Sequence, residues 1–403
     1  MKIIVVSCTF PPEPVVSART SFDVANFLET KGNRVQVVCP HPSRNNSKQE
    51  AQDENLPFLI KRVFSIKSTK STFFSRFLEN ISFGLSTFMF IIRQKKVDVI
   101  YANTWPIFAT GLVVIASKIK KYKVVISIQD LYPESLVTQR RISENGIVAK
   151  MFIFFDKWIA KNCDHIIVIS EWFESVYVKS RLIKKSKISV IKNWVQSDDI
   201  LQIEKLFARS DIERHIGHSF DKDDTICIYG GNIGTASGLD EFIQFIPKIN
   251  TRVKFIFAGD GSLVPELKCL LSEQKMNDRV FFITPWPSEM TSSVLSSADI
   301  LLLPTAKGQE FSSVPSKLIT YMLASKPIML IADCESEIAK ELKKAECGLV
   351  ISTRSSEMVA NGFSEFLQKS DKMKEKMGLC GRQYAKNNYS YEPSVNKIYS
   401  LLK

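Results

Sequence analysis

The chain has 403 residues, of which 45% are apolar and 24% charged, and a formal net charge of +12. This length exceeds what one ordinary core holds, so we expect a soluble globular protein of two domains, each of roughly 150–200 residues. No run approaches the ~18 uncharged apolar residues of a membrane-spanning helix, and the first residues lack the small-residue cleavage site of a signal peptide.

Eight cysteines are scattered along the chain without a CxxC pair, and the four histidines do not cluster near them. Structural zinc sites and disulfide frameworks both use characteristic cysteine spacings. We therefore predict no metal site, and free thiols of the kind found in a reducing cytoplasm.

The excess positive charge is confined to the first half of the chain. Residues 1–197 carry 29 Lys and Arg against 15 Asp and Glu, whereas residues 198–403 carry 25 against 27. Such asymmetry favours a polyanionic partner, namely nucleic acid, an anionic membrane surface or a lipid diphosphate. A basic surface that is merely solvated is the alternative.

The first half alternates strands and helices. Short β-branched runs predict strands at 2–8, 33–40, 98–104, 123–130, 164–170 and 188–193. Apolar residues at helical spacing predict helices at 21–32, 71–96, 108–121, 149–163 and 171–181. This alternation is typical of a doubly wound parallel sheet, which we assign to one domain, residues 1–197.

After polar sequence at 207–224, a second series of strand–helix pairs begins. Its strands start at residues 225, 253, 280, 299, 327 and 348. We assign residues 198–380 to a second Rossmann-like domain and residues 381–403 to a C-terminal helix that returns to the first. Sheets of this kind bind ligands at the carboxyl ends of their strands, so we expect a site in a cleft between the domains.

Two turns of the second domain suit phosphate binding. In "SSVPSK" (312–317), Pro315 fits the first position of a helix over 315–324, and Lys317 follows in its first turn. A cation there opposes the helix dipole unless an anion lies between them. In "YGGNIGTASG" (229–238), glycines let backbone N–H groups point at phosphate oxygens. The structural alternatives are an exposed lysine and a tight turn, and we interpret "AGDGS" (258–262) as a tight turn.

Taken together, the motifs resemble those of the retaining GT-B glycosyltransferases of family 4. The likeness covers nearly the whole chain. It rests on "FPPE" with Arg19, "DLYPE" (130–134), "ISEWF" (169–173), "VIKNWV" (190–195), "YGGNIGTASGLDEFI", "FAGDGSLVPELK" and "VPSKLITYMLASKPI". The resemblance implies an α/β GT-B fold, in which two Rossmann-like domains face each other across a cleft. One branch that the chain resembles comprises bacterial O-antigen, capsule and exopolysaccharide enzymes, including L-fucosaminyltransferases.

The resemblance also implies roles for individual residues. Lys317, with Ser316 beside it, would neutralise the diphosphate of the donor. The other implied donor-binding residues are Gly231, Asn232, Gly234, Pro285, Trp286, Ser313, Pro315 and Thr320. Glu13 and Arg19 would line the acceptor side. The catalytic residues would be Lys317, Asp130 and Glu134, with both carboxylates facing the reacting sugar.

The chain departs from the family pattern near Lys317. Relatives commonly have two glutamates eight residues apart, and here Ser312 and Thr320 take those places. The second glutamate holds the ribose hydroxyls in relatives, whereas Thr320 offers only a shorter, neutral hydrogen bond. The Arg and Lys that usually follow the first strand of the second domain are replaced by "GNIGTASG".

The resemblance predicts transfer of a sugar from a nucleotide diphosphate donor, such as UDP-L-FucNAc or another UDP-N-acetyl-deoxyhexosamine. The expected acceptor is a polyprenyl-diphosphate-linked saccharide. We expect no metal or other cofactor and no nucleic-acid partner. The basic and apolar segment 61–96 would attach the protein peripherally to the anionic inner face of the plasma membrane.

Two other functions remain open at this point. UDP-sugar 2-epimerases share the fold, but they would need a histidine in the cleft, and all four histidines fall elsewhere. A basic nucleotide or nucleic-acid binder without enzymatic activity would show a basic stripe with exposed aromatic residues or a known binding module.

Overall fold

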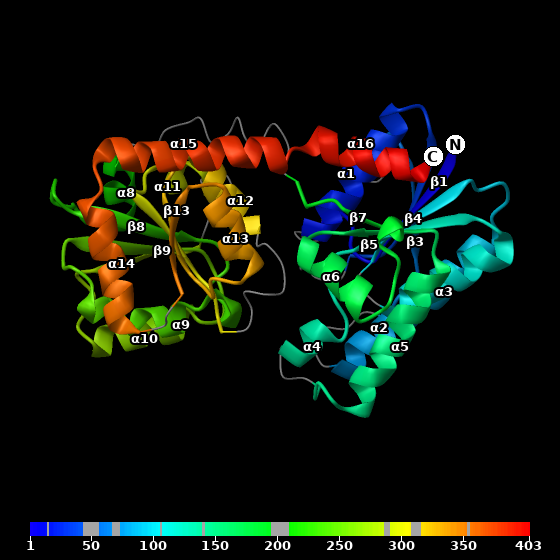
Figure 1. Ribbon diagram of the computed structural model, residues 1–403, viewed down its shortest axis with the longest axis horizontal. Coiled ribbons are helices and arrows are strands. Elements are labelled where there is room, and N and C mark those ends of the chain that lie inside the picture. The colour runs from blue at the N-terminus through cyan, green and yellow to red at the C-terminus, as the bar shows by residue number, and fades with distance from the viewer. Residues whose placement is uncertain are drawn as a thin grey trace. The chain divides into compact units, whose positions relative to one another are not determined.

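A computed structural model shows two compact units, each built on one parallel sheet (Figure 1). The first unit comprises Met1–Trp194 and Glu392–Lys403, and the second comprises Val195–Tyr391. The structure describes residues 1–13, 16–42, 56–66, 73–104, 107–138, 142–194, 209–285, 291–307, 316–352 and 355–403.

The first unit has a seven-stranded sheet of order β3-β2-β1-β4-β5-β6-β7. Its strands are β1 (Lys2–Ser7), β2 (Arg34–Pro40), β3 (Leu59–Val63), β4 (Val99–Thr104), β5 (Lys123–Ile128), β6 (His165–Val168) and β7 (Ile188–Val190). Its helices are α1 (Val16–Thr30), α2 (Phe73–Arg93), α3 (Ile107–Lys120), α4 (Glu134–Thr138), α5 (Ile147–Asn162), α6 (Glu171–Lys179), the 3-10 helix η2 (Lys185–Lys187) and α16 (Tyr391–Leu402).

The second unit has a six-stranded sheet of order β10-β9-β8-β11-β12-β13. Its strands are β8 (Thr225–Gly230), β9 (Val253–Ala258), β10 (Val280–Ile283), β11 (Ile300–Pro304), β12 (Ile328–Ile331) and β13 (Gly348–Ile351). Its helices are α8 (Arg209–Ile216), η3 (Thr235–Ser237), α9 (Leu239–Ile243), η4 (Ile246–Lys248), α10 (Val264–Glu273), α11 (Thr291–Ser296), α12 (Ser316–Leu323), α13 (Glu337–Lys344), α14 (Ser356–Gln368) and α15 (Asp371–Asn388).

The burial of the strands explains why short apolar runs in the sequence form the strands of parallel sheets. The middle strands β1, β5, β8, β9 and β11 are buried along nearly their whole length, because helices cover both faces of a doubly wound sheet. Both predicted Rossmann-like domains are therefore confirmed. The edge strand β3 was missed, since its side chains alternate between exposed and half-buried up to Val63 and give no apolar run.

The C-terminal region is divided differently from the expected boundary at 381. Helix α15 continues to Asn388 in the second unit, and the chain joins the first unit only at Glu392. There Lys397 Nζ donates to the carbonyl of Val190 at 3.0 Å, and Lys123 Nζ donates to that of Leu401 at 3.0 Å. The helix that belongs to the first unit is therefore α16.

Glycine determines how closely α15 approaches the end of α12. A Cβ built on Gly378 would lie 2.0 Å from the carbonyl oxygen of Ser325. Gly111 of α3 is a useful contrast, since a Cβ there would meet Ile159 Cδ1 at an ordinary 3.6 Å.

We predict that Gly378→Ala lowers the free energy of unfolding by about 1–3 kcal/mol, because the added methyl forces two backbones apart. Gly111→Ala should be neutral or stabilising by up to about 1 kcal/mol, as expected for Ala in a helix. Urea unfolding followed by circular dichroism measures both. Equal stability of the two variants would contradict the close approach.

Candidate functional site

The predicted lysine and the predicted glycine loop lie against each other in the second unit. Lys317 is in the first turn of α12, and the glycine loop follows β8. The Nζ of Lys317 donates to the hydroxyl of Tyr229 and, at 3.2 Å, to the carbonyl of Asn232. The same Nζ lies 4.3 Å from the centroid of the Tyr229 ring. Segments 88 residues apart in sequence thus form one small polar site.

Gly231 is the position that permits this contact. Its φ of +132° lies in the region that favours glycine, and a Cβ would be 2.5 Å from Lys317 Cε. Gly234 differs, since its backbone is extended, with φ −118° and ψ −179°. The two predicted glycines therefore have unequal importance: only Gly231 makes room for the lysine stem.

Two tyrosines hold the loop in place, and sequence reasoning missed both. The Tyr229 hydroxyl donates to the carbonyl of Asn232 at 2.6 Å. The Tyr321 hydroxyl accepts from the N–H of Gly230 at 2.7 Å and donates to the carbonyl of the same residue at 3.1 Å. Signals were available, because Tyr229 directly precedes the glycine pair and Tyr321 lies one helical turn after Lys317.

The neighbouring loop, Gly259–Gly261, packs backbone to backbone on the first one. A Cβ on Gly259 would lie 1.9 Å from the carbonyl oxygen of Gly231, and one on Gly261 would lie 2.1 Å from that of Ile233. Ile233 also donates its N–H to the carbonyl of Asp260 at 2.8 Å. Gly259 and Gly261 therefore let their loop pack directly on the backbone of the loop that follows β8, which agrees with the prediction that residues 258–262 form a tight turn.

Burial makes the charge on Lys317 costly. Desolvation lowers the pKa of its ammonium from 10.5 to about 8. Among the described residues, its polar partners are a phenol and a peptide carbonyl, which carry no charge. Neutral partners do not neutralise the positive charge of the ammonium, and a nearby helix N-terminus also favours a negative charge, so an anion could bind between the two.

The other donor-side residues are described only in part. Trp286, Ser313 and Pro315 lie outside the described residues, as does the side chain of Ser316, whose backbone opens α12. Pro285 is exposed just beyond β10. Thr320 is half-buried on α12, three residues after Lys317.

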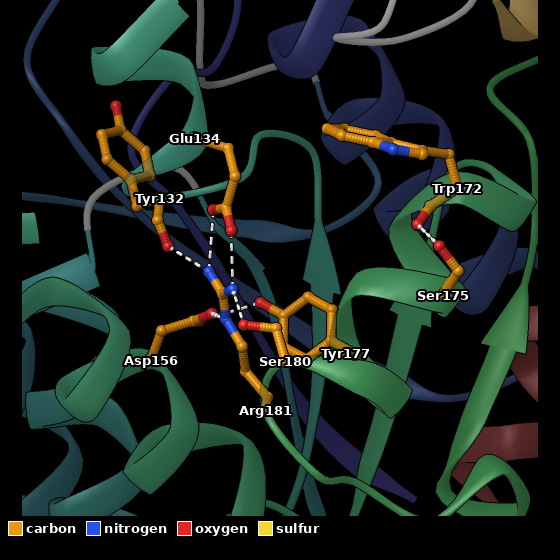
Figure 2. A network of polar contacts seen from close by, with 8 residues as sticks. All are labelled: Tyr132, Glu134, Asp156, Trp172, Ser175, Tyr177, Ser180 and Arg181. Carbon is orange, nitrogen blue, oxygen red and sulfur yellow. Dashed lines mark hydrogen bonds and ion pairs between the residues drawn. The ribbon is translucent and has the colours of Figure 1, made fainter. Parts of the chain in front are cut away.

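In the first unit, Glu134 is committed to a buried arginine (Figure 2). Arg181 is fully buried, and its Nη1 and Nη2 bond the two oxygens of Glu134 at 2.6 and 2.7 Å. Its Nε bonds Asp156 at 2.8 Å, and Nη2 also donates to the carbonyl of Tyr132 at 2.7 Å. The sequence predicted that Glu134 faces a reacting sugar, whereas both of its oxygens are used to neutralise Arg181.

Asp156, which sequence reasoning also missed, completes this network. It accepts a hydrogen bond from the Tyr177 hydroxyl at 2.8 Å as well as the one from Arg181. Burial raises the pKa of its carboxyl from 3.8 to about 6, against the opposing effect of Arg181. The network ties α5 to the residues after α6 and to the start of α4.

Asp130 has a different environment. It follows β5, is half-buried, and lines a small cavity of about 20 Å³ together with Thr110, Asp156 and Tyr177. Of the two predicted catalytic carboxylates, Glu134 is the one that Figure 2 shows bonded to Arg181 through both of its oxygens.

On the predicted acceptor side, Glu13 is buried and Arg19 is exposed in the second turn of α1. A polar cluster that the sequence did not reveal anchors this helix. Asn103, near the end of β4, donates to Ser21 Oγ at 2.6 Å and to the carbonyl of Ser17 at 3.1 Å. It fixes the first turns of α1 at the carboxyl edge of the sheet.

Among the residues that the structure describes, no group of three or more His, Cys, Asp or Glu side chains is arranged to hold a metal ion. Within the same residues, each helix is too short or too polar to cross a bilayer.

Two family models match the chain, one in each half. The model described as Glycosyltransferase Family 4 matches residues 17–199, and the model described as Glycosyl transferases group 1 matches residues 211–384.

Curated relatives are distant. A probable glycosyltransferase of Pseudomonas aeruginosa, WbjE, is 22% identical over 342 residues, which is 84% of this chain and 82% of that protein. An O-antigen biosynthesis glycosyltransferase of Escherichia coli, WclY, is 26% identical over 220 residues, which is 52% of this chain and 55% of the relative.

Solved structures share the fold across the whole chain. Alr3699/HepE of Anabaena, in complex with UDP, has a TM-score of 0.74 at 15% identity, covering 100% of this chain and 99% of that one. Sucrose-phosphate synthase from Thermosynechococcus elongatus has a TM-score of 0.76 at 15% identity, covering 99% and 98%. With the two parallel sheets, these likenesses confirm the predicted GT-B fold.

The lowered pKa of Lys317 predicts a pH-dependent anion site. Below pH 8 the ammonium is charged and should bind inorganic pyrophosphate. As the pH rises through 8 it loses its proton, and affinity should fall by up to about tenfold per pH unit. Calorimetric titration against pH measures this. Lys317→Met should bind weakly at every pH and so report any change due to the ionisation of pyrophosphate itself. Parallel pH profiles for the two proteins would contradict the prediction.

The Arg181 network predicts that Glu134 matters for stability. Glu134→Gln should lower the free energy of unfolding by about 1.5–3 kcal/mol, because a charged hydrogen-bond partner of a buried arginine is lost. The control is Glu144→Gln, an exposed position that should change stability by less than about 0.5 kcal/mol. Chemical unfolding measures the free energy of unfolding of both variants. Equal values for Glu134→Gln and Glu144→Gln would show that Glu134 does not contribute to stability.

Proposed function

We propose that this chain, which is a glycosyltransferase with the GT-B fold, moves a sugar from a nucleoside diphosphate donor to a lipid-linked saccharide and retains the anomeric configuration. The observation that carries the donor assignment is the Lys317 ammonium, which lies over Gly231 and whose polar partners among the described residues are neutral. A diphosphate would supply a negative charge that these partners do not provide.

The chemistry requires stabilisation of the leaving group. The bond between the anomeric carbon and the diphosphate oxygen breaks, and the oxygen that leaves gains negative charge. In the proposal, Lys317 and the N–H groups at the start of α12 stabilise that charge. The acceptor hydroxyl attacks the same face of the sugar and gives its proton to the departing phosphate. The proposal needs no protein nucleophile and no metal ion.

Asp130 remains the proposed counter-charge for the positive sugar ring of the transition state. The proposal assigns that role to Asp130 in preference to Glu134, whose carboxylate pairs with Arg181. Thr320 remains the proposed residue near the ribose, one turn after Lys317 on α12.

The finer assignments have separate support. A uridine nucleotide agrees with the UDP present in the Anabaena structure of the same fold. A UDP-N-acetyl-deoxyhexosamine such as UDP-L-FucNAc rests on the sequence resemblance alone. The name of the Escherichia coli relative, together with the basic first half, favours a polyprenyl-diphosphate-linked acceptor of O-antigen or a similar polysaccharide, at the inner face of the plasma membrane. Both family models describe glycosyltransferases, which disfavours the epimerase and the non-enzymatic binder.

A panel of UDP-, GDP- and dTDP-sugars with a synthetic GlcNAc-diphosphate-lipid acceptor tests the proposal. We expect one class of donor to give product by mass spectrometry, and NMR of that product to show the anomer of the donor. An inverted product would refute retention.

Lys317→Ala should reduce turnover by roughly 10²–10³, the usual effect of losing one such stabilising group. The control, Lys340→Ala, removes a partly exposed lysine of α13 that pairs only with Glu335 in the described contacts, and should retain normal turnover. Near-normal turnover in a folded Lys317→Ala protein would refute the donor site.

A further inference from the structure

Helices α2, α3 and α5 lie together in the first unit (Figure 1). Side chains of all three line an open apolar groove. Its volume is about 560 Å³, within the range of sites that hold small ligands. Side chains from all three helices line it, among them Ile81, Leu85, Phe108, Ile115, Phe154 and Trp158. We call this surface the three-helix face.

The three-helix face exposes more large apolar side chains than a solvated surface usually does. Phe154 is 66% exposed, Ile147 is 87% exposed and Ile119 is 60% exposed. Met89 and Met151 are also exposed, and each lies four residues from a groove-lining side chain of its helix, Leu85 and Phe155, so helical spacing puts them on the same side. Contiguous apolar surface of this kind marks a binding site for a protein or a membrane.

The charge around the groove is that of a surface that meets anions. The three helices contain seven Lys and Arg residues and two acidic ones. One of the acids, Asp156, is buried against Arg181 and contributes no surface charge. Lys150 and Lys161 are exposed on α5, and Lys118 is exposed near the end of α3.

The groove borders the small cavity that Asp130 lines. Ile107 and Ile159 line both. A hydrocarbon chain lying in the groove would therefore be separated from that cavity by these two side chains.

From the apolar groove, its basic surroundings and its position next to the Asp130 cavity, we propose that the three-helix face docks on an anionic lipid bilayer, and that the groove receives a hydrocarbon chain of a bilayer lipid. The proposal rests on the proposed function in one respect, since a lipid-linked acceptor would present such a chain. It extends the expectation for segment 61–96 to α3 and α5, which also carry exposed apolar side chains.

Vesicle flotation tests the docking surface. The full chain should bind vesicles of phosphatidylcholine mixed with phosphatidylglycerol, and bind vesicles of pure phosphatidylcholine much more weakly. The double variant Ile147→Ser/Phe154→Ser should lose at least about tenfold in partitioning, because two exposed apolar side chains no longer enter the bilayer. Leu182→Ser is the matched control, since Leu182 is 65% exposed in the same unit but outside the three-helix face, and it should bind normally.

Two further variants separate charge from the groove. Lys150→Gln/Lys157→Gln should weaken binding to anionic vesicles by about fivefold per lysine and leave binding to neutral vesicles unchanged. Gly111→Phe should fill the groove, since a Cβ at Gly111 meets only Ile159 at 3.6 Å, and it should weaken partitioning without removing any surface charge. Circular dichroism verifies that each variant is folded.

The outcomes distinguish this proposal from the proposed function. Equal vesicle binding by Ile147→Ser/Phe154→Ser and by the unchanged chain would overturn the docking surface, whatever the enzymatic result. So would a dimer in sedimentation that dissociates in the same variant, because a second copy would then be the occupant. Transfer to a soluble saccharide acceptor without a lipid should be equal in all these variants. If the unchanged chain transfers no sugar but shows the predicted vesicle binding, the proposed function fails and the docking surface stands.

Discussion

The approach of Lys317 to Gly231 is the contact on which the candidate site depends. A lysine stem can lie on the loop only because residue 231 has no Cβ and adopts a positive φ. Burial then makes the ammonium easier to deprotonate, and its polar partners within the described part of the chain are uncharged. An enzyme that must stabilise a departing diphosphate benefits from such a preorganised cation, because the protein meets the cost of orienting it during folding and not during the reaction.

The rest of the second unit holds that contact at a fixed geometry. Tyr229 and Tyr321 bond the backbone of the glycine loop from the strand side and the helix side, and the Gly259–Gly261 loop supports it through direct backbone packing. In the first unit, a charged contact between distant residues contributes to stability. Glu134 lies near the end of a strand, where a reactive group is expected, and it pairs with the buried Arg181. Position at the edge of a sheet therefore does not by itself make a carboxylate catalytic.

Sequence reasoning predicted what depends on local pattern. The apolar runs identified the two parallel sheets, and the glycines with Lys317 identified the loop and helix that meet in the second unit. It failed where the outcome depends on partners far away in the chain. The interaction of Glu134 with Arg181 spans 47 residues and leaves no local signal. The position of Tyr321 one turn after Lys317 was a local signal for the helix face, but its hydrogen-bond partner, Gly230, lies 91 residues away. Strand β3 was missed for another reason: at a sheet edge, partly exposed side chains give no apolar run.

The discontinuity of the first unit has a consequence for how the protein is made. Its seven strands are complete at Val190, but α16, whose Lys397 bonds the carbonyl of that residue, is translated only after the second unit. Domains commonly fold as they leave the ribosome, in order from the N-terminus. Here the first unit can gain its contacts with α16 only after about 200 residues of the second unit have been translated. A helix that follows the second unit in sequence therefore completes the unit that was begun first.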